Sequence, residues 1–292
     1  MSIYLQILIN SIISGLLLSL VAIGFTYIYQ ITKVFHLAHA GVLVAGAYSY
    51  LFFLNRLDSV FISLLLSIFL ISILSVLIEK LVYLPISENK VNQAISLISS
   101  MGVYIIIINM ISIIFGSENQ TLPSNISNVN TFGKIIITDI QFLQLVISIL
   151  ILILSTLFLY FSKLNLKFRA IADHKVLSEV FGFNIRKNRV IVIVFGSLLS
   201  LVAAVLITYE IGIEPHSGMG ITLSAVVVAI LVSRLEISWL IAFSILLVVF
   251  QNLTEWFLNA QWKQGMTYLI LLLVLLLKKD GLISYNLRKD TV

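Results

Sequence analysis

A pair of histidines offers the clearest chemistry in the first quarter of the chain. His36 and His39 stand at the start of an apolar run, in which Ala38, Gly41 and Gly46 help to form a face of small residues. A polar group within an apolar segment is costly to bury, and it commonly contacts a transported solute or ion. We expect His39 either to donate to a polar solute from the wall of a pore or to be satisfied by a neighbouring carbonyl at the helix end.

Two further places carry polar groups that can meet a solute. Asn10 faces one side of the first apolar run. Like His39, it is expected either to contact a polar solute or to be satisfied by a neighbouring group of the protein. In the segment "YEIGIEPHSGMG" (209–220), a proline and two glycines interrupt helix geometry. Glu214 and His216 add ionisable groups there. Because broken backbone near a membrane is tolerated where it lines a cavity, this segment is either a mouth that accepts solute or an ordinary exposed loop.

A charged segment, 163–189, separates two apolar runs and contains a short amphipathic pattern. Asp173 is positioned to serve as the N-cap of a helix, and Gly182 suits the left-handed residue just past its end. An apolar stripe at three- and four-residue spacing lies between them, and it consists of Val176, Leu177, Val180 and Phe181. The residues expected to contact a partner here are Arg169, Asp173, Leu177, Glu179, Val180, Phe181 and Gly182.

Basic residues flank this short helix on both sides, and two explanations remain open. The flanks are Lys167 and Arg169 before the helix, and Arg186, Lys187 and Arg189 after it. In one explanation they anchor two membrane spans at anionic headgroups, and the apolar stripe lies against the bilayer. In the other, the helix docks into a groove on a cytoplasmic partner.

Catalytic and cofactor-binding motifs are missing from the sequence. It has no cysteine, and its four histidines lack the spacing of a zinc site. No G-x-x-x-x-G-K-[ST] motif occurs, so ATP phosphates cannot be held by a P-loop. We predict that the chain is not an enzyme and needs no cofactor or metal, and that any ATP is hydrolysed by a separate subunit.

The apolar runs that must position these residues are long enough to cross a membrane. The chain has 292 residues, of which 60% are hydrophobic and 11% charged, whereas soluble domains carry roughly 25% charged residues. A membrane helix needs about 20 apolar residues. We predict an all-α, polytopic membrane protein of eight to ten elements in one domain, 1–292, with spans at about 5–29, 38–54, 61–83, 94–115, 141–162, 190–209, 220–233, 237–253 and 265–277. Two of the last three are short enough to be half-helices.

The distribution of basic residues predicts the orientation of these spans. If 163–189 is cytoplasmic, only Arg56, Lys134 and Lys263 of the 18 Lys and Arg residues fall outside. Cytoplasmic loops are enriched in Lys and Arg, so the N-terminus is expected outside and the C-terminus in the cytoplasm. The net charge of +5 has the same cause and does not indicate nucleic acid.

Within the spans, two smaller patterns lead to further expectations. Asn109, Gln144 and Gln251 are expected to make interhelical hydrogen bonds. The segments "GLLLSLVA" (15–22) and "GSLLSLVA" (196–203) share a core and run in opposite directions in the expected topology. They are either an inverted repeat or a chance match in a chain rich in Leu, Ser and Val.

Several motifs, in order and spread over nearly the whole chain, resemble one family of permeases. The stretch "LNLKFRAIADHKVLSEVFGFNIRKNRV" is similar to the main cytoplasmic loop of ABC-importer permeases of the branched-chain amino acid type. "HLAHAGVLVAGAYSYL" looks like that family's N-F-A-H-G-(D/E)-x-x-x-x-G-A-Y block, and "EKLVYLPI" resembles its E-R-x-x-Y-R-P. The closing "LLLLVLLLKKDGLI" resembles its last apolar run.

The resemblance implies a subunit of an ATP-driven importer in a bacterial or archaeal cytoplasmic membrane. It implies that the helix at 173–182 couples to an ATPase. The partners implied are a second permease, identical or similar, two cytoplasmic ATPase subunits and an extracytoplasmic solute-binding protein. Branched-chain or related amino acids are the first expected solutes, ahead of urea or amides, and then sugars or nucleosides. An autonomous channel or a secondary transporter remains the alternative.

The sequence departs from the family pattern in two places. His36 and Leu37 replace Asn-Phe, and Ala40 and Gly41 replace glycine and an acidic residue. Near 226–245, "VVVAILVSRLEISWLIAFSIL" replaces a glycine-rich stretch. These departures bear on the identity of the solute and on how two permeases pair.

Overall fold

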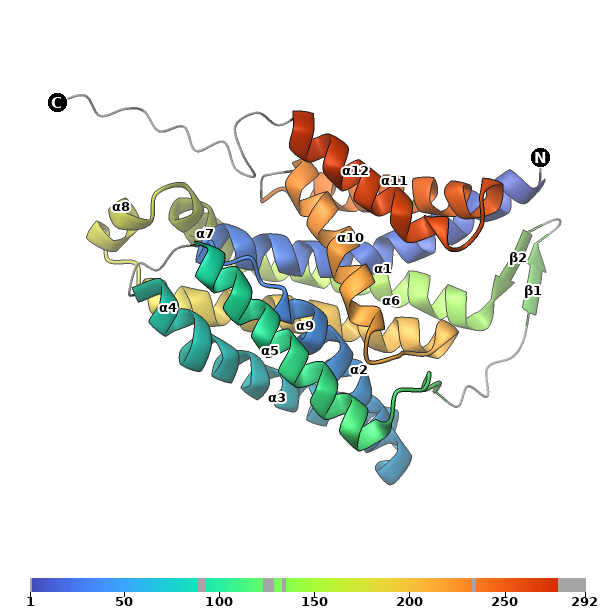
Figure 1. Cartoon of the computed structure of the whole chain (residues 1–292), viewed down its shortest axis with the longest axis horizontal. Helices are drawn as coiled ribbons and strands as arrows, with labels where there is room; N and C mark the ends of the chain where they lie inside the picture. The colour runs from blue at the N-terminus through green and yellow to red at the C-terminus, as the bar shows by residue number, and fades with distance from the viewer. Residues whose placement is uncertain (1, 89–92, 123–128, 133–134, 233–234, 278–292) are drawn as a thin grey trace.

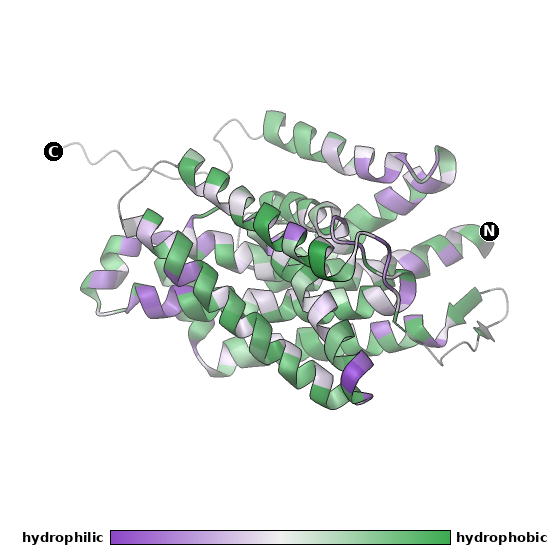
Figure 2. Ribbon diagram, turned by 60° about the horizontal axis from the view of Figure 1, so that its bottom comes forward, coloured by the Kyte–Doolittle hydropathy of each residue, from purple (hydrophilic) through white to green (hydrophobic). Residues whose placement is uncertain are grey.

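A computed structural model of the chain describes residues 2–88, 93–122, 129–132, 135–232 and 235–277. Long helices lie side by side along one direction, with hydrophobic residues along their bodies and hydrophilic residues gathered toward their ends (Figures 1 and 2). The predicted all-α, polytopic class is confirmed, because seven helical segments are long and apolar enough to cross a membrane.

The nine predicted spans correspond to helices with similar bounds. The helices long enough to span are α1 (Ser2–Thr32), α2 (Ala38–Leu57), α3 (Val60–Ile78) with its continuation, α5 (Gln93–Phe115), α6 (Asp139–Phe161), α9 (Ile185–Ile211) and α11 (Ile237–Phe257). Two shorter apolar helices are α10 (Ser217–Val232) and α12 (Trp262–Leu277). Helix α3 continues through a π-helical turn, η1 (Glu79–Tyr83), into α4 (Leu84–Glu88).

Helices α1 and α9 form the buried centre of the bundle and run in opposite directions (Figure 1). They approach most closely at two glycines, where a Cβ added to Gly24 would lie 2.7 Å from the Gly196 carbonyl oxygen. Only a missing side chain permits such an approach of two backbones. The antiparallel pair agrees with an inverted repeat, which stays a prediction.

Non-helical connectors precede both α2 and α10, and both enter the protein interior. Residues 33–37 join α1 to α2, and His36 and Leu37 are buried. Residues 212–216 join α9 to α10, where a Cβ on Gly218 would lie 2.5 Å from the Ala40 carbonyl oxygen. The two broken segments therefore bring the start of α10 against the first turns of α2.

The long connection between α5 and α6 contains structure that the sequence did not indicate. Strands β1 (Val129–Phe132) and β2 (Ile135–Thr138) pair antiparallel, with Val129 opposite Thr138. Farther upstream, Gln120 and Ile213 exchange two backbone hydrogen bonds of 2.9 Å. The segment 209–220 is therefore tied to this loop at Ile213 and is more than a free connection.

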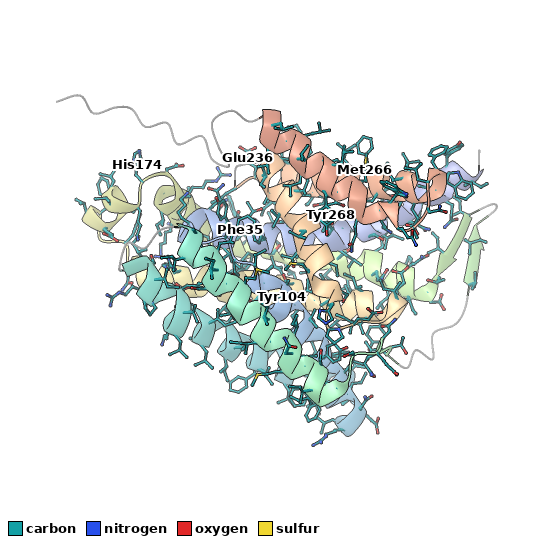
Figure 3. All side chains as sticks on the ribbon, viewed as in Figure 1. Phe35, Tyr104, His174, Glu236, Met266 and Tyr268 are labelled. Atoms are coloured by element: carbon teal, nitrogen blue, oxygen red, sulfur yellow. The ribbon has the colours of Figure 1, made fainter. Side chains whose placement is uncertain are left out.

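The charged segment 163–189 is more helical than expected. Helix α7 (Leu164–Asp173) precedes α8 (Lys175–Val180), and His174 lies between them (Figure 3). The prediction of Asp173 as an N-cap is wrong, because Asp173 is the last residue of α7 and the N-cap of α8 is His174. The apolar pattern continues upstream in Phe168 and Ile171, which are buried, so the preceding turns also fold as helix.

Candidate functional site

His36, Tyr83 and Ser100 form a buried polar cluster beside the start of α2. The Nδ1 atom of His36 lies 2.7 Å from the Tyr83 hydroxyl, which donates to Ser100 Oγ at 2.8 Å. The backbone N–H of Ala38 donates to the same Ser100 oxygen. Burial, reinforced by the nearby His39, holds the pKa of His36 well below its usual value, so its imidazole is neutral at pH 7. The cluster joins α2, the π-helical turn and α5.

His39 is wholly buried, and its observed partner differs from the neighbouring carbonyl that was one of the two expectations. Its Nε2 atom lies 2.6 Å from the Ser200 hydroxyl, in the middle of α9, and so its partner is not a carbonyl. Its ring centroid lies 5.6 Å from that of His36. The predicted role of His39 as a donor to solute stays a prediction, since the ring is enclosed by protein in this conformation.

A buried ion pair that no sequence motif indicated lies close to this cluster. Arg189 Nε lies 2.5 Å from Glu79 Oε1, and both side chains are almost fully buried. The same guanidinium donates to the Thr32 carbonyl and to Ser87 Oγ. The sequence grouped Arg189 with the basic residues that flank the short helix, whereas the structure buries it against Glu79, the residue that follows the last turn of α3. The π-helical turn, a feature often found at functional sites, carries Glu79 and Tyr83 inward together.

The small residues of α2 lie at helix contacts. A Cβ added to Gly41 would lie 3.2 Å from Ile107 of α5, and one on Gly46 would lie 3.3 Å from Leu201 of α9. Neither glycine lines the large cavity of the molecule. Their predicted place on a solute pathway stays a prediction.

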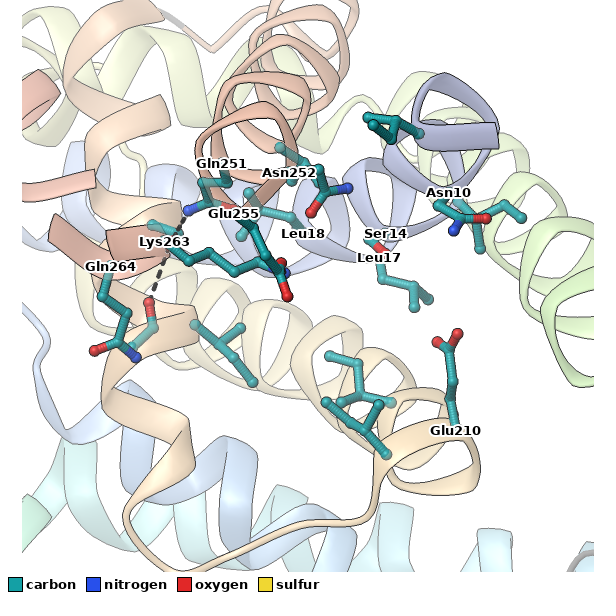
Figure 4. A pocket seen from close by; sticks show the side chains of 18 of the residues that line it. Asn10, Ser14, Leu17, Leu18, Glu210, Gln251, Asn252, Glu255, Lys263 and Gln264 are labelled. Atoms are coloured by element: carbon teal, nitrogen blue, oxygen red, sulfur yellow. Dashed lines mark hydrogen bonds and ion pairs between the residues drawn. The ribbon is translucent and has the colours of Figure 1, made fainter. Parts of the chain in front are cut away.

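That cavity, of about 730 Å³, opens near the end of the bundle that carries the N-terminus. Helices α1, α6, α9, α10, α11 and α12 line it, and Asn10 is among its polar residues (Figure 4). Glu214 and His216 are exposed on the adjacent connector and do not line it. Of the residues expected on the solute path, Asn10 alone faces this space.

The lining combines polar groups with an aliphatic wall. Glu210 accepts hydrogen bonds from Gln141 and Gln144, and Glu255 pairs with Lys263 at 2.9 Å. The cavity can therefore offer charges of both signs and apolar surface to a small solute. Nothing in the sequence indicated the amides of Gln141 and Gln144 around the Glu210 carboxylate.

At the opposite end of the bundle, the apolar stripe of α8 faces away from the rest of the protein. The four residues of the stripe, Val176, Leu177, Val180 and Phe181, are each more than half exposed. Gly182 has the left-handed φ of +82° that was predicted, and its N–H donates to the Glu179 carbonyl. The N–H of Phe183 donates to the Ser178 carbonyl, which completes a Schellman end.

Helix α7 attaches α8 to the helix bundle. Phe168 is buried against Tyr27 of α1, whose hydroxyl donates to Asn165. Arg169 donates to the Leu235 carbonyl, which precedes α11. Burial lowers the pKa of the Lys33 ammonium, and the Asp173 carboxylate partly opposes that effect. Of the residues expected to contact a partner, Arg169 and Asp173 thus also interact with the bundle.

Comparisons with known proteins agree over nearly the whole chain. The sequence profile described as the permease component of branched-chain amino acid transport systems matches residues 7–275. The high-affinity branched-chain amino acid transport system permease protein BraD of Pseudomonas aeruginosa is 29% identical over 96% of each chain. The corresponding permease LivH of Salmonella typhimurium is 27% identical over 96% of each chain. A probable branched-chain amino acid permease, LivH of Methanocaldococcus jannaschii, is 24% identical over 97% of this chain and 94% of its own.

Proposed function

Because the chain belongs to the permease-component family of branched-chain amino acid transport systems, a family of transporters rather than enzymes, we propose that it is the membrane subunit of an ATP-driven importer. Its solute would be a branched-chain or related amino acid, as the names of its relatives indicate for those proteins. The feature that carries the ATP-driven part of the proposal is α8, an exposed apolar helix fixed at the end of a membrane bundle.

The exposed stripe of α8 supports docking to a partner. Val180 and Phe181 are 77% and 72% exposed, at the tip of a segment that is otherwise charged. The Schellman end fixes the direction of the helix, and α7 holds its base against α1. A rigid, short apolar face suits insertion into a groove of an ATPase better than loose contact with lipid headgroups.

In the proposed assembly this chain pairs with a second permease, identical or similar, in a bacterial or archaeal cytoplasmic membrane. Two ATPase subunits bind the α8 helices from the cytoplasm, and a solute-binding protein delivers amino acid from outside. The N-terminus lies outside and the C-terminus in the cytoplasm, consistent with the excess of basic residues on the α8 side. The chain itself holds no cofactor, and ATP is used by its partners.

Charging the stripe tests the proposal. Leu177→Asp, at a half-exposed position, should release the ATPase from the detergent-purified complex and abolish ATP-dependent leucine uptake in proteoliposomes. Leu57→Asp is the matched control, since Leu57 is similarly exposed but lies at the end of α2, away from α8. Stoichiometric ATPase retained by Leu177→Asp, or leucine uptake by the purified chain without any ATPase, would contradict the proposal.

A further inference from the structure

The cavity at the N-terminal end of the bundle has the size and composition of a small-molecule site. Its volume of about 730 Å³ lies within the roughly 300–1,000 Å³ typical of such sites. Figure 4 shows Asn10 and Glu210 toward one side of this space, with Glu255 and Lys263 toward the other. Because six helices contribute to it, the cavity is a shared surface of the bundle rather than a gap beside one helix.

Glu210 gives the cavity a negative charge that no cation balances among the described lining residues. Its two carboxylate oxygens accept from the amides of Gln141 and Gln144, each at 3.0 Å. The cationic lining residue, Lys263, is already paired with Glu255. Neutral amides orient a carboxylate without cancelling its charge, so Glu210 is suited to receive a cationic group such as an ammonium.

Asn10 and Ser14 supply hydrogen-bond donors one helical turn apart on α1. The Oδ1 atom of Asn10 accepts from Gln6 at 3.0 Å, which leaves its NH₂ group as the free end of the amide. Within the described chain, no hydrogen bond uses that nitrogen or the Ser14 hydroxyl, and both residues line the cavity. These donors are suited to a carboxylate.

Much of the remaining wall is aliphatic, although Trp256 and the polar residues Ser224, Gln251, Asn252 and Gln264 also line the cavity. The aliphatic part is formed by side chains of α1, α9, α10 and α11, among them Leu17, Leu18, Ile207, Ile221 and Val248. A branched hydrocarbon group placed there loses contact with water, a gain of about 25 cal/mol per Å² of apolar surface buried. The three kinds of surface match the three parts of an aliphatic amino acid.

From this arrangement we propose that the cavity binds the zwitterion of an aliphatic amino acid. The ammonium pairs with Glu210, the carboxylate accepts from Asn10 and Ser14, and the side chain lies on the aliphatic wall. This assignment rests on the proposed function. It adds a binding site in the membrane subunit that selects solutes independently of the solute-binding protein. A solute released by a binding protein would thus be recognised a second time, by its two charges together.

Leucine and two analogues that each lack one charge provide the test. Saturation-transfer NMR on the full-length chain, co-purified in nanodiscs with its permease and ATPase partners but without the solute-binding protein, measures binding of leucine, 4-methylpentanoate and leucinamide at millimolar concentration. Glu210→Gln should weaken leucine binding by about tenfold to a hundredfold, the worth of one charge-assisted hydrogen bond, and should abolish the preference for leucine over 4-methylpentanoate. Asn10→Asp should weaken leucine but not leucinamide, because the new carboxylate repels only the former.

Glu118→Gln is the matched control, since Glu118 is exposed in the outer loop and outside the cavity. A merely structural effect of Glu210→Gln would weaken all three ligands alike and would overturn the assignment. So would wild-type leucine binding in that variant, or no transfer to leucine in the wild-type protein. If ATP-driven import persists in any of these cases, the proposed function stands and only the site is wrong.

An amine-bearing lipid headgroup shares the ammonium chemistry, so the lipid is varied as well. In nanodiscs of phosphatidylcholine and phosphatidylglycerol, no primary amine competes with leucine. Leucine binding should be the same after phosphatidylethanolamine is included. If that lipid displaces leucine from the wild-type protein but not from Glu210→Gln, the cavity is a lipid site and the proposal is wrong.

Discussion

The two ends of the bundle use polar residues in opposite ways. Toward the α8 end, Glu79, Arg189 and His36 are almost fully buried and are bonded to other parts of the protein. At the end with the N-terminus, Glu255 and Lys263 are each 42% exposed and face a hollow. The first set fixes helices to one another, while the second is open to a solute.

Burial decides how much a charged pair contributes to stability at each end. A buried pair has a large desolvation cost, and only its precise partners offset that cost. A half-exposed pair keeps most of its hydration, so separating its two charges has a small free-energy cost. The buried pair at the α8 end therefore holds helices together, whereas the charges at the cavity end can separate from one another and contact a solute.

Breaking the buried pair should have the largest effect. Arg189→Met leaves the Glu79 carboxylate buried without its cation, and the expected loss in the free energy of unfolding is about 3–5 kcal/mol. Unfolding by a denaturing detergent, followed by circular dichroism, measures it. The double variant Arg189→Met/Glu79→Leu should recover most of that loss. A single variant as stable as the wild type would show that the α8 end is not held in this way.

Acidification should weaken the same end by a smaller amount. The pKa of His36 is lowered in the folded chain by burial and by His39, so below about pH 6.5 the unfolded state binds more protons. The free energy of unfolding should then fall as the pH drops from 7 to 5, at up to about 1.4 kcal/mol per pH unit. Unfolding midpoints across that range measure the slope.

His36→Gln should reduce that slope, because it removes one group whose proton uptake differs between the two states. The exposed His216 offers a control, and His216→Gln should leave the slope unchanged. An equal slope in His36→Gln and the wild type would assign the pH effect to other groups.

The smallest effect is expected at the cavity end. Lys263→Met removes the partner of Glu255, and since both side chains are 42% exposed, the change in stability should stay below about 1 kcal/mol. The same detergent titration applies. A loss as large as that of Arg189→Met would erase the contrast between the two ends.

The sequence predicted the spans well because each is a continuous apolar run, and most of them are about as long as a membrane helix requires. Interhelical contacts were harder to predict. Gln144 and Gln251 do bond to other helices, as expected, but Asn109 donates to Ile105 of its own helix. An amide side chain on a helix surface can reach a backbone carbonyl of its own helix as well as a group on a neighbouring helix. The sequence pattern alone does not show which of these two hydrogen bonds forms.

The candidate site residues also differ in how well the sequence predicted them. Asn10 and Gly182 were recognisable from local chemistry, a lone amide in an apolar run and a glycine after an amphipathic turn. The ion pair joins residues 110 positions apart, and the register that brings Glu79 inward depends on a π-helical turn. No local pattern carries that information, so only the folded chain revealed it.

Helix α9 connects the two ends of the bundle. Its first turns carry Arg189, its middle carries Ser200 against His39, and its last turn carries Glu210. Its close contact with α1, at Gly196 and Gly24, lies about 17 Å from the first residue of α9 and about 21 Å from Glu210. If α9 tilted by a few degrees as a rigid body about that contact, its two ends would shift by about 1–2 Å in opposite directions. A displacement at the α8 end would then be accompanied by an opposite and slightly larger displacement at the cavity.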